Sequence, residues 1–226
     1  MLSVNFVANM KRIAFYGGSF DPPHNGHLTI ARKLSELFEL DEFVFVPAFQ
    51  APHKKDKSPT LSFHRYAMLA LATEDEAQSK VSTIELEIPA KPYTFETLLK
   101  LKKELPGTEI FFVMGADSWA EIDTWREWET VLTLTNVIVV TRPDYEIGFS
   151  HVSERIKKRI VDLRGNFQFR KVEGKTISDT HIYITDAVNL DVSSREIRRQ
   201  IQVNSAKWRE LVPEEVAKYI EKYDIY

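Results

Sequence analysis

Two glycines and two histidines in one short segment are the residues of this chain best suited to chemistry. The segment is Tyr16-Gly17-Gly18-Ser19-Phe20-Asp21-Pro22-Pro23-His24-Asn25-Gly26-His27, and it lies between a short apolar run and a helical pattern. A strand that empties into a glycine loop before a helix exposes backbone N–H groups and the positive end of the helix dipole, and both favour phosphate. His24 and His27 fall on one face of the first helical turn. The pattern predicts a nucleoside triphosphate site.

Simpler structural explanations exist for each part of this segment. Gly17-Gly18 alone fits any tight strand-to-helix turn, and a lone histidine is more often a capping or core residue. The two histidines around Gly26 together favour the phosphate interpretation. No Gly-Lys-Ser or Gly-Lys-Thr follows, and the three-glycine spacing of dinucleotide-binding proteins is absent.

Composition excludes several classes of protein. The 226 residues are 43% hydrophobic and 28% charged, which is typical of a globular protein with a buried core. The net charge of -3 argues against a protein that coats nucleic acid. The absence of cysteine excludes disulfides, thiolate zinc sites and cysteine nucleophiles. No apolar run is long enough to span a membrane and the first ten residues do not resemble a signal peptide, so we expect a cytoplasmic protein.

Short apolar runs alternate with helical patterns through the first part of the chain. We predict strands at Ile13–Tyr16, Phe43–Val46, Val81–Ile88, Ile110–Met114 and Val137–Val140. Helical spacing predicts helices over 28–38, 65–72 and 94–101, with Thr94 as a cap, and the capping-box pattern at 124–127 predicts another.

This alternation implies an α/β fold with a doubly wound parallel sheet and helices on both faces. Ligands bind beyond the carboxyl ends of such strands. We therefore expect one crevice, lined by the loops that follow Tyr16, Val46, Met114 and Val140.

The pattern weakens after Arg142. We expect a helix over 153–163, a strand at Ile182–Ile184, a second capping box at Ser193–Glu196 and a last helix that begins at Pro213. The chain would form a single domain over 11–226, with a core over 11–145. The C-terminal portion, 146–226, would be small and helical.

Six ordered blocks resemble the nucleotidylyltransferase superfamily, whose mark is His-x-Gly-His, and more closely the bacterial nicotinate-nucleotide adenylyltransferases. The blocks are Gly17–Leu28, Pro52-His53-Lys54, Arg65-x-x-Met68, Tyr93-Thr94-x-x-Thr97-Leu98, Gly115-Ala116-Asp117 with Trp125 eight residues on, and Val192-Ser193-Ser194-x-x-Ile197-Arg198. The resemblance spans nearly the whole chain, and it implies a Rossmann-like nucleotidylyltransferase fold.

The resemblance also implies a reaction. The adenylyl group of ATP would pass to nicotinate mononucleotide, which gives deamido-NAD and pyrophosphate in NAD biosynthesis. ATP is then a co-substrate, and Mg²⁺ would be bound through its phosphates rather than by a metal site of protein ligands. Nucleic acid and membrane would not be partners, and the oligomeric state is left open.

Roles follow from the matched positions. His24, His27 and Arg198 would act on the phosphates as the catalytic residues, and Asp117 would accept hydrogen bonds from ribose. Trp125 would stack on the pyridine ring. The residues expected to bind ATP are Gly17, Gly18, Ser19, Phe20, Gly115, Asp117, Ser193 and Ser194. Those expected to bind the second substrate are Lys54, Tyr93, Thr94 and Trp125.

Some of these side chains have structural alternatives, and two segments depart from the family pattern. Ser193 and Asp117 could simply cap helices, and Trp125 could be a core residue. Ala90-Lys91-Pro92 stands where the family usually has an arginine and a small hydroxyl residue, so the preference for nicotinate over nicotinamide is open. Arg195 replaces a threonine. The alternative functions are the same transfer to nicotinamide mononucleotide or another phosphate acceptor, and a non-catalytic sensor of ATP or NAD.

Overall fold

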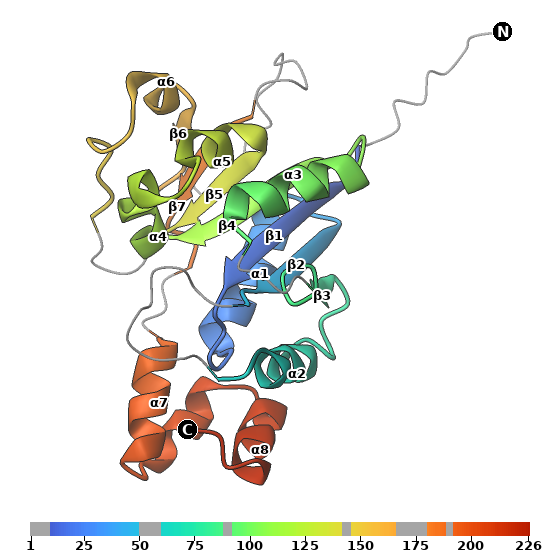
Figure 1. Ribbon diagram of the computed structural model, residues 1–226. Helices are drawn as coiled ribbons and strands as arrows, with labels where there is room; N and C mark the ends of the chain where they lie inside the picture. Colours follow the sequence, from blue (N-terminus) through green and yellow to red (C-terminus); the bar gives the residue numbers. More distant parts are fainter. Residues whose placement is uncertain (1–9, 50–59, 88–91, 142–145, 166–179, 189–191) are drawn as a thin grey trace, which may run out of the picture.

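A seven-stranded parallel sheet with helices on both faces forms the centre of the molecule (Figure 1). The structure is a computed structural model that describes residues 10–49, 60–87, 92–141, 146–165, 180–188 and 192–226. The strand order is β3-β2-β1-β4-β5-β7-β6. The strands are β1 (Arg12–Gly18), β2 (Glu42–Pro47), β3 (Ser79–Val81), β4 (Glu109–Gly115), β5 (Asn136–Val140), β6 (Ile160–Asp162) and β7 (Ile182–Thr185). The predicted doubly wound α/β fold is confirmed.

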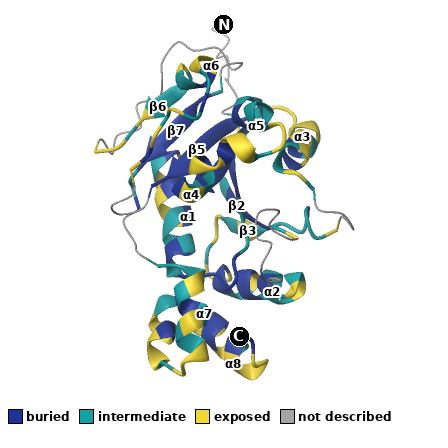
Figure 2. Ribbon diagram, turned by 60° about the vertical axis from the view of Figure 1, so that its left-hand side comes forward, coloured by how far each residue is buried: buried dark blue, intermediate teal, exposed yellow. Residues whose placement is uncertain are grey.

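Buried side chains alternate between the two faces of the central strands, so each face has its own apolar core. Ala14 and Tyr16 of β1 point to one core, and Ile13 and Phe15 point to the other. The first core packs against α1 (Asn25–Leu37), α2 (Ser62–Ala72), α7 (Ser194–Gln202), η2 (Ala206–Leu211) and α8 (Glu214–Lys222). The second packs against α3 (Thr94–Glu104), α4 (Ala116–Ala120), η1 (Ile122–Thr124), α5 (Trp128–Leu134) and α6 (Glu154–Lys157). Figure 2 shows the buried strands between these helices.

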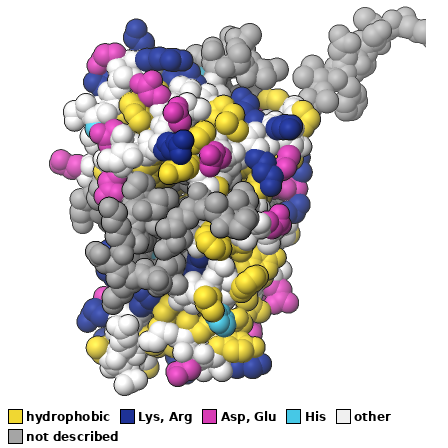
Figure 3. All heavy atoms as spheres, viewed as in Figure 1, with side chains coloured by type: hydrophobic (Ala, Val, Ile, Leu, Met, Phe, Trp, Pro, Cys, Tyr) yellow, Lys and Arg dark blue, Asp and Glu magenta, His cyan; other side chains and the backbone are white. Residues whose placement is uncertain are grey.

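The last helices lie beyond the carboxyl ends of the strands rather than on the middle of the sheet (Figure 1). There α8 packs against α2. Apolar side chains gather on the outer surface of this region (Figure 3). Leu61, Phe63 and Tyr223 are exposed, with Phe63 the most exposed of the three at 80%. None of the helices in the described part of the chain has both the length and the apolar character that a bilayer crossing needs.

Two predicted elements are much shorter than expected. The strand predicted over Val81–Ile88 ends at Val81, because the chain turns there: the backbone N–H of Leu86 donates to Thr83 O at 2.7 Å. The apolar residues after Val81 therefore alternate within a turn, and Ile84 is buried in the second core.

The helix predicted over 153–163 is also wrong. Only Glu154–Lys157 is helical, and Ile160–Asp162 forms the edge strand β6, with Ile160 paired to Ile182. The sheet thus takes two strands, β6 and β7, from the part of the chain that follows residue 145.

Two predicted caps lie elsewhere. Thr124 does not open a helix, because its hydroxyl donates to Glu121 O and Glu127 adopts a left-handed conformation with φ 53°. The helix α5 begins only at Trp128. Thr94 is the first residue of α3 rather than its cap, which is Tyr93.

Candidate active site

The predicted site lies between β1 and β4, where the order in which the chain adds strands to the sheet reverses. Strands β1 and β4 are neighbours, and the chain proceeds from β1 toward β2 on one side and from β4 toward β5 on the other. Tyr16 is in register with Val113, and both strands continue for two residues, to Gly18 and Gly115. The two glycines therefore end adjacent strands at the same level, at the kind of position where open parallel sheets bind ligands.

The loop after β1 is built around Phe20. Its backbone is left-handed, with φ 47°, which is uncommon for a bulky residue and indicates that the surroundings hold the loop in place. The Phe20 ring lies over Gly18, where a Cβ would be 2.8 Å from a ring carbon. Gly18 is therefore needed for this loop shape. Gly17 has more space, since a Cβ there would be 3.5 Å from Phe112.

The two histidines are stacked at the start of α1. Their ring centroids are 3.6 Å apart with an interplanar angle of 22°, and His24 is 5% exposed. The backbone N–H of His24 donates to Nδ1 of His27 at 3.1 Å. This bond requires an unprotonated Nδ1, so the proton of the neutral His27 ring is on Nε2.

Gly26 explains the spacing of the histidine pair. A Cβ on Gly26 would be 3.0 Å from Nδ1 of His24, so a larger residue would displace that ring. The same Cβ would lie 3.7 Å from Cβ of Val192, so the chain just before α7 passes beside the start of α1.

The start of α7 docks on the β1–α1 loop. The Ser194 hydroxyl donates to Pro22 O at 2.9 Å, and Nη1 of Arg198 donates to Asp21 O. Ser193 caps the helix, because its Oγ accepts from Glu196 N at 3.3 Å. The predicted capping box is only half formed, since the Glu196 carboxylate bonds Arg199 and Gln200 instead. The structure thus brings Ser193, Ser194 and Arg198 to the histidine loop.

Gly115 and Asp117 lie at the carboxyl end of β4, next to the end of β1. A Cβ on Gly115 would be 2.6 Å from Oδ1 of Asp117, so Gly115 leaves room for that carboxylate. Oδ1 accepts from the backbone N–H of Ser118 at 3.0 Å within the first turn of α4, whose cap position is Gly115 rather than Asp117. The side chain is otherwise exposed at the end of the strand.

Arg126 and Tyr93 are in contact at the start of α3. The Arg126 guanidinium lies 4.7 Å from the centroid of the Tyr93 ring, and Arg126 directly follows the half-buried Trp125. This contact links Tyr93 and Thr94 to the segment that carries Trp125. Lys54, also predicted to bind the second substrate, lies outside the described residues. No catalytic or binding role was expected for Arg126 from the sequence.

Among the charged residues that the structure describes, Arg65 is the most deeply buried, at 1% exposed. Its guanidinium donates to four backbone carbonyls, those of Ser19, Ala48, Phe49 and Thr60, at 2.7–3.1 Å. Burial lowers the pKa of Arg65, and the nearby Asp21 carboxylate opposes this shift. Arg65 therefore fixes the β1–α1 loop and the chain after β2 relative to α2. In the sequence, the feature that could have indicated this role is that Arg65 is a charged residue on the apolar face of a helical pattern.

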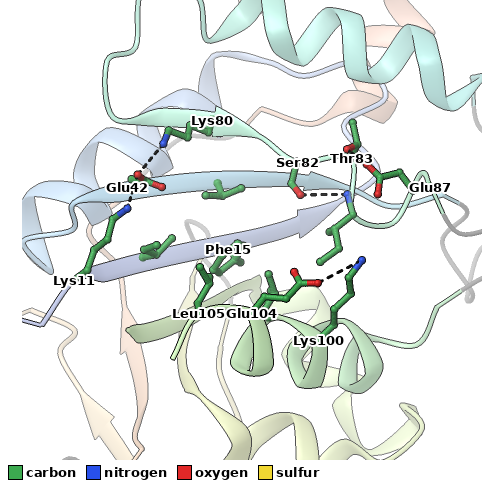
Figure 4. A pocket seen from close by; sticks show the side chains of 14 residues that line it. Lys11, Phe15, Glu42, Lys80, Ser82, Thr83, Glu87, Lys100, Glu104 and Leu105 are labelled. Atoms are coloured by element: carbon green, nitrogen blue, oxygen red, sulfur yellow. Dashed lines mark hydrogen bonds and ion pairs between the residues drawn. The ribbon is translucent and has the colours of Figure 1, made fainter. Parts of the chain in front are cut away.

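A groove of about 530 Å³ is separate from these residues. It lies between α3 and strands β1–β3, and Figure 4 shows Lys11 and Glu42 at the beginnings of their strands. Lys11 and Lys80 both pair with Glu42 at 2.7 Å, and Lys100 pairs with Glu104 at 4.0 Å. These charges satisfy one another, and none of the predicted site residues lines the groove.

Comparison with known proteins agrees with this geometry. The family model described as cytidylyltransferase-like matches residues 15–200. A probable nicotinate-nucleotide adenylyltransferase of Geobacter sp. (strain M21) is 36% identical over 95% of this chain and 98% of its own length. One from Clostridium tetani (strain Massachusetts / E88) is 35% identical over 96% of this chain and 100% of its own. The chain belongs to the nicotinate-nucleotide adenylyltransferase family.

A solved structure has the same fold. Plasmodium falciparum nicotinic acid mononucleotide adenylyltransferase, complexed with NaAD, superposes with a TM-score of 0.70 at 22% identity. The superposition covers 96% of this chain and 97% of the other. The two proteins therefore share one fold.

Proposed function

We propose that this protein transfers the adenylyl group of ATP to nicotinate mononucleotide in NAD biosynthesis. One observation carries the proposal: the helix start at Ser193–Arg198 docks on the loop that carries His24 and His27, through Ser194 and Pro22 at 2.9 Å. Two segments with the chemistry of phosphate sites, from opposite ends of the chain, thus meet at the switch point of the sheet. Family membership supports the same reaction.

The triphosphate would lie between the two helix starts. A phosphate oxygen of nicotinate mononucleotide forms a bond to the α-phosphorus of ATP. The bond from that phosphorus to its bridging oxygen breaks, and the electron pair leaves with pyrophosphate. The attacking phosphate is already anionic, so no general base is needed, and catalysis depends on alignment and charge stabilisation.

The residues at the two helix starts would supply hydrogen-bond donors and positive charge to the phosphates of ATP. Nε2 of His27 carries a proton, as the Nδ1 contact requires, and His24 is stacked against it. Arg198 brings a positive charge, and the first amides of α7 have no acceptor within the helix. Gly17, Gly18, Ser19 and Phe20 would shape the loop around the phosphates, while Asp117 would accept hydrogen bonds from ribose.

Mg²⁺ would supply further neutralisation of phosphate charge and would enter with ATP, held by phosphate oxygens and water. Within the described segments, no group of three or more His, Asp or Glu side chains is arranged to hold a metal ion. The donors present, imidazole and guanidinium, are suited to phosphate oxygens rather than to the ion.

The start of α3 would hold the pyridine ring. Trp125 would stack on it, and the Arg126 cation and the positive end of α3 would both attract the carboxylate of nicotinate. Pro92 removes one backbone donor near this pocket, but the charge of Arg126 favours an anionic ring substituent over an amide. We infer a preference for nicotinate over nicotinamide mononucleotide.

The test is a side-by-side assay with ATP, Mg²⁺ and each mononucleotide. We expect pyrophosphate release with the dinucleotide as co-product, and kcat/KM at least about tenfold higher for nicotinate mononucleotide, the ratio that one charged contact can give. Binding of ATP with no dinucleotide from either substrate would instead support a nucleotide sensor. Equal rates with the two substrates would contradict the role of Arg126.

A further inference from the structure

Asp21 is the point where four distant segments meet. Its Oδ1 accepts from the Tyr226 hydroxyl at 2.7 Å, and its Oδ2 accepts from Thr60 N at 3.3 Å. Its backbone O accepts from Arg198 Nη1. The contacts come from the β1–α1 loop, the chain before α2, α7 and the residues after α8. Asp21 itself is 8% exposed.

The Asp21 carboxylate is close to Arg198 but does not form a close pair with it. Nη1 of Arg198 is 4.0 Å from Oδ2, while the same nitrogen bonds the Asp21 carbonyl. A small rotation of the carboxylate would create a close ion pair, which is the strongest hydrogen-bonded arrangement available to a guanidinium. Such a pair would compete with any phosphate for Arg198. Because Tyr226 and Thr60 each bond one carboxylate oxygen, they oppose this rotation.

Tyr226 is suited to hold the carboxylate permanently. Its ring packs on the same apolar core as α1 and α8. Burial, together with the Asp21 charge, raises the pKa of the phenol, so its hydroxyl keeps its proton and always donates. The contact depends on the fold of the last helix, since Tyr226 follows α8 by only a few residues.

We propose that Tyr226 is a positioning residue that restrains Asp21 and so keeps Arg198 available for the polyphosphate of ATP. The inference rests on the proposed function, in which Arg198 contacts ATP. In this proposal, the effect of Tyr226 on ATP binding acts through the Asp21 carboxylate; the Tyr226 hydroxyl also faces the Thr60 side chain and the charge of Arg198.

The first experiment is Tyr226→Phe, which removes only the hydroxyl group. We expect the dissociation constant of ATP, measured by calorimetry without the second substrate, to rise about tenfold, the scale of one hydrogen bond to a charged group. The KM of nicotinate mononucleotide should not change. The control is Tyr223→Phe, because that exposed ring contacts His64 and Tyr219 instead. It should bind ATP as the wild type does. Unchanged ATP binding in Tyr226→Phe, or an equal loss for both substrates, would overturn the proposal.

The decisive experiment adds Asp21→Asn to Tyr226→Phe. Without the charge, the side chain no longer competes for Arg198, so ATP affinity should return to within about threefold of the wild type, whereas independent effects would add. A double variant weaker than Tyr226→Phe alone would refute the mechanism. If Tyr226→Phe does not fold, Asp21→Asn alone is informative: it should bind ATP at least as tightly as the wild type, and weaker binding would contradict the proposal.

The binding readout separates this inference from the proposed reaction. A wild type that binds ATP but forms no dinucleotide would refute the reaction, and the calorimetric comparison of the variants would still test Tyr226.

Discussion

His27 is held in one orientation before any ligand arrives. The His24 backbone N–H fixes its Nδ1, and the Phe20 ring packs edge-on against it with centroids 5.0 Å apart. Donors that need no reorganisation stabilise transition-state charge most effectively. The loop therefore explains why this histidine is a strong candidate for catalysis.

Replacing His27 should damage turnover more than folding. In His27→Ala we expect kcat to fall by about 10²–10³-fold, the usual effect of removing one preorganised donor. The melting temperature should change little. A pyrophosphate-release assay checks this. The matched control is His64→Ala, because His64 lies outside this loop and its ring bonds the Tyr219 hydroxyl at 2.9 Å. A kcat near the wild-type value would contradict the role of His27.

Glu85 makes stability depend on pH. Burial raises its pKa to about 7, although its hydrogen bond from Thr97 Oγ1 at 3.1 Å acts in the opposite direction. The folded protein thus holds a proton that the unfolded chain releases near pH 4.5, the ordinary value. The corresponding stabilisation is present at low pH and is lost as the pH rises through 7.

Glu85→Gln should remove this dependence. Relative to the wild type, the variant should gain about 2 kcal/mol in unfolding free energy between pH 4.5 and pH 8, with allowance for the solvent that reaches this partly exposed side chain. Urea unfolding at the two pH values measures the gain. A constant difference between the two proteins would show that Glu85 titrates normally.

At the scale of elements, α7 depends on a single side-chain cap. Ser193 accepts from Glu196 N, and the next residue, Ser194, docks on Pro22. Ser193→Ala should cost about 1 kcal/mol of stability, the usual value of such a cap. It should also weaken ATP binding, because the helix start would fray.

Ser205→Ala is the matched control for this prediction. Ser205 precedes η2 and makes no side-chain cap bond in the described structure. Chemical denaturation and ATP titration of both variants measure the two effects. Equal behaviour of the two alanine variants would show that the cap of α7 does not matter.

The sequence predicts the buried elements best. Strands β4 and β5 are continuous apolar runs, and such runs have few alternatives inside a parallel sheet. The pattern over Val81–Ile88 was misleading because Ile84 is buried against α3 from a turn, not from a strand. At 153–163 the chain makes one helical turn and then pairs with β7. Neither a turn nor an edge pairing has a distinct hydrophobic period.

Local contacts of the candidate site could also be predicted from the sequence, whereas its long-range contacts could not. His24, His27 and Ser193 were visible because their partners lie within three residues, and local spacing therefore describes them. Asp21 and Tyr226 bond across 205 residues, and Arg198 reaches Asp21 across 177. The resemblance pointed to Arg198 as a residue, but its contact with Asp21 and that of Tyr226 depend on the assembled fold, so no pattern in the sequence marks these two contacts.

At the scale of the whole molecule, the site is a junction between the sheet and the last helices. Besides the contacts of α7, Nδ2 of Asn25 donates to Glu210 O at 3.0 Å, so η2 also touches the first residue of α1. A ligand that contacts the starts of both α1 and α7 should stabilise both helix starts.

Hydrogen exchange should show this coupling. With saturating ATP, we expect slower exchange of the amides at the starts of α1 and α7 together, and unchanged exchange in α5. Exchange followed by mass spectrometry resolves these segments. Protection of α1 alone would indicate that α7 does not take part in binding.

The dependence of the histidine loop on residues 193–226 has a consequence for biosynthesis. A nascent chain emerging from the ribosome carries both histidines early. It still lacks Arg198, Tyr226 and the apolar residues, such as Trp208 and Ile220, that cover the same core as Leu34. Chains that stop before residue 193 would therefore leave apolar surface of this core exposed and would lack the contacts of Arg198 and Tyr226 with Asp21. Translation must therefore reach residues 193–226 before the histidine loop gains these contacts.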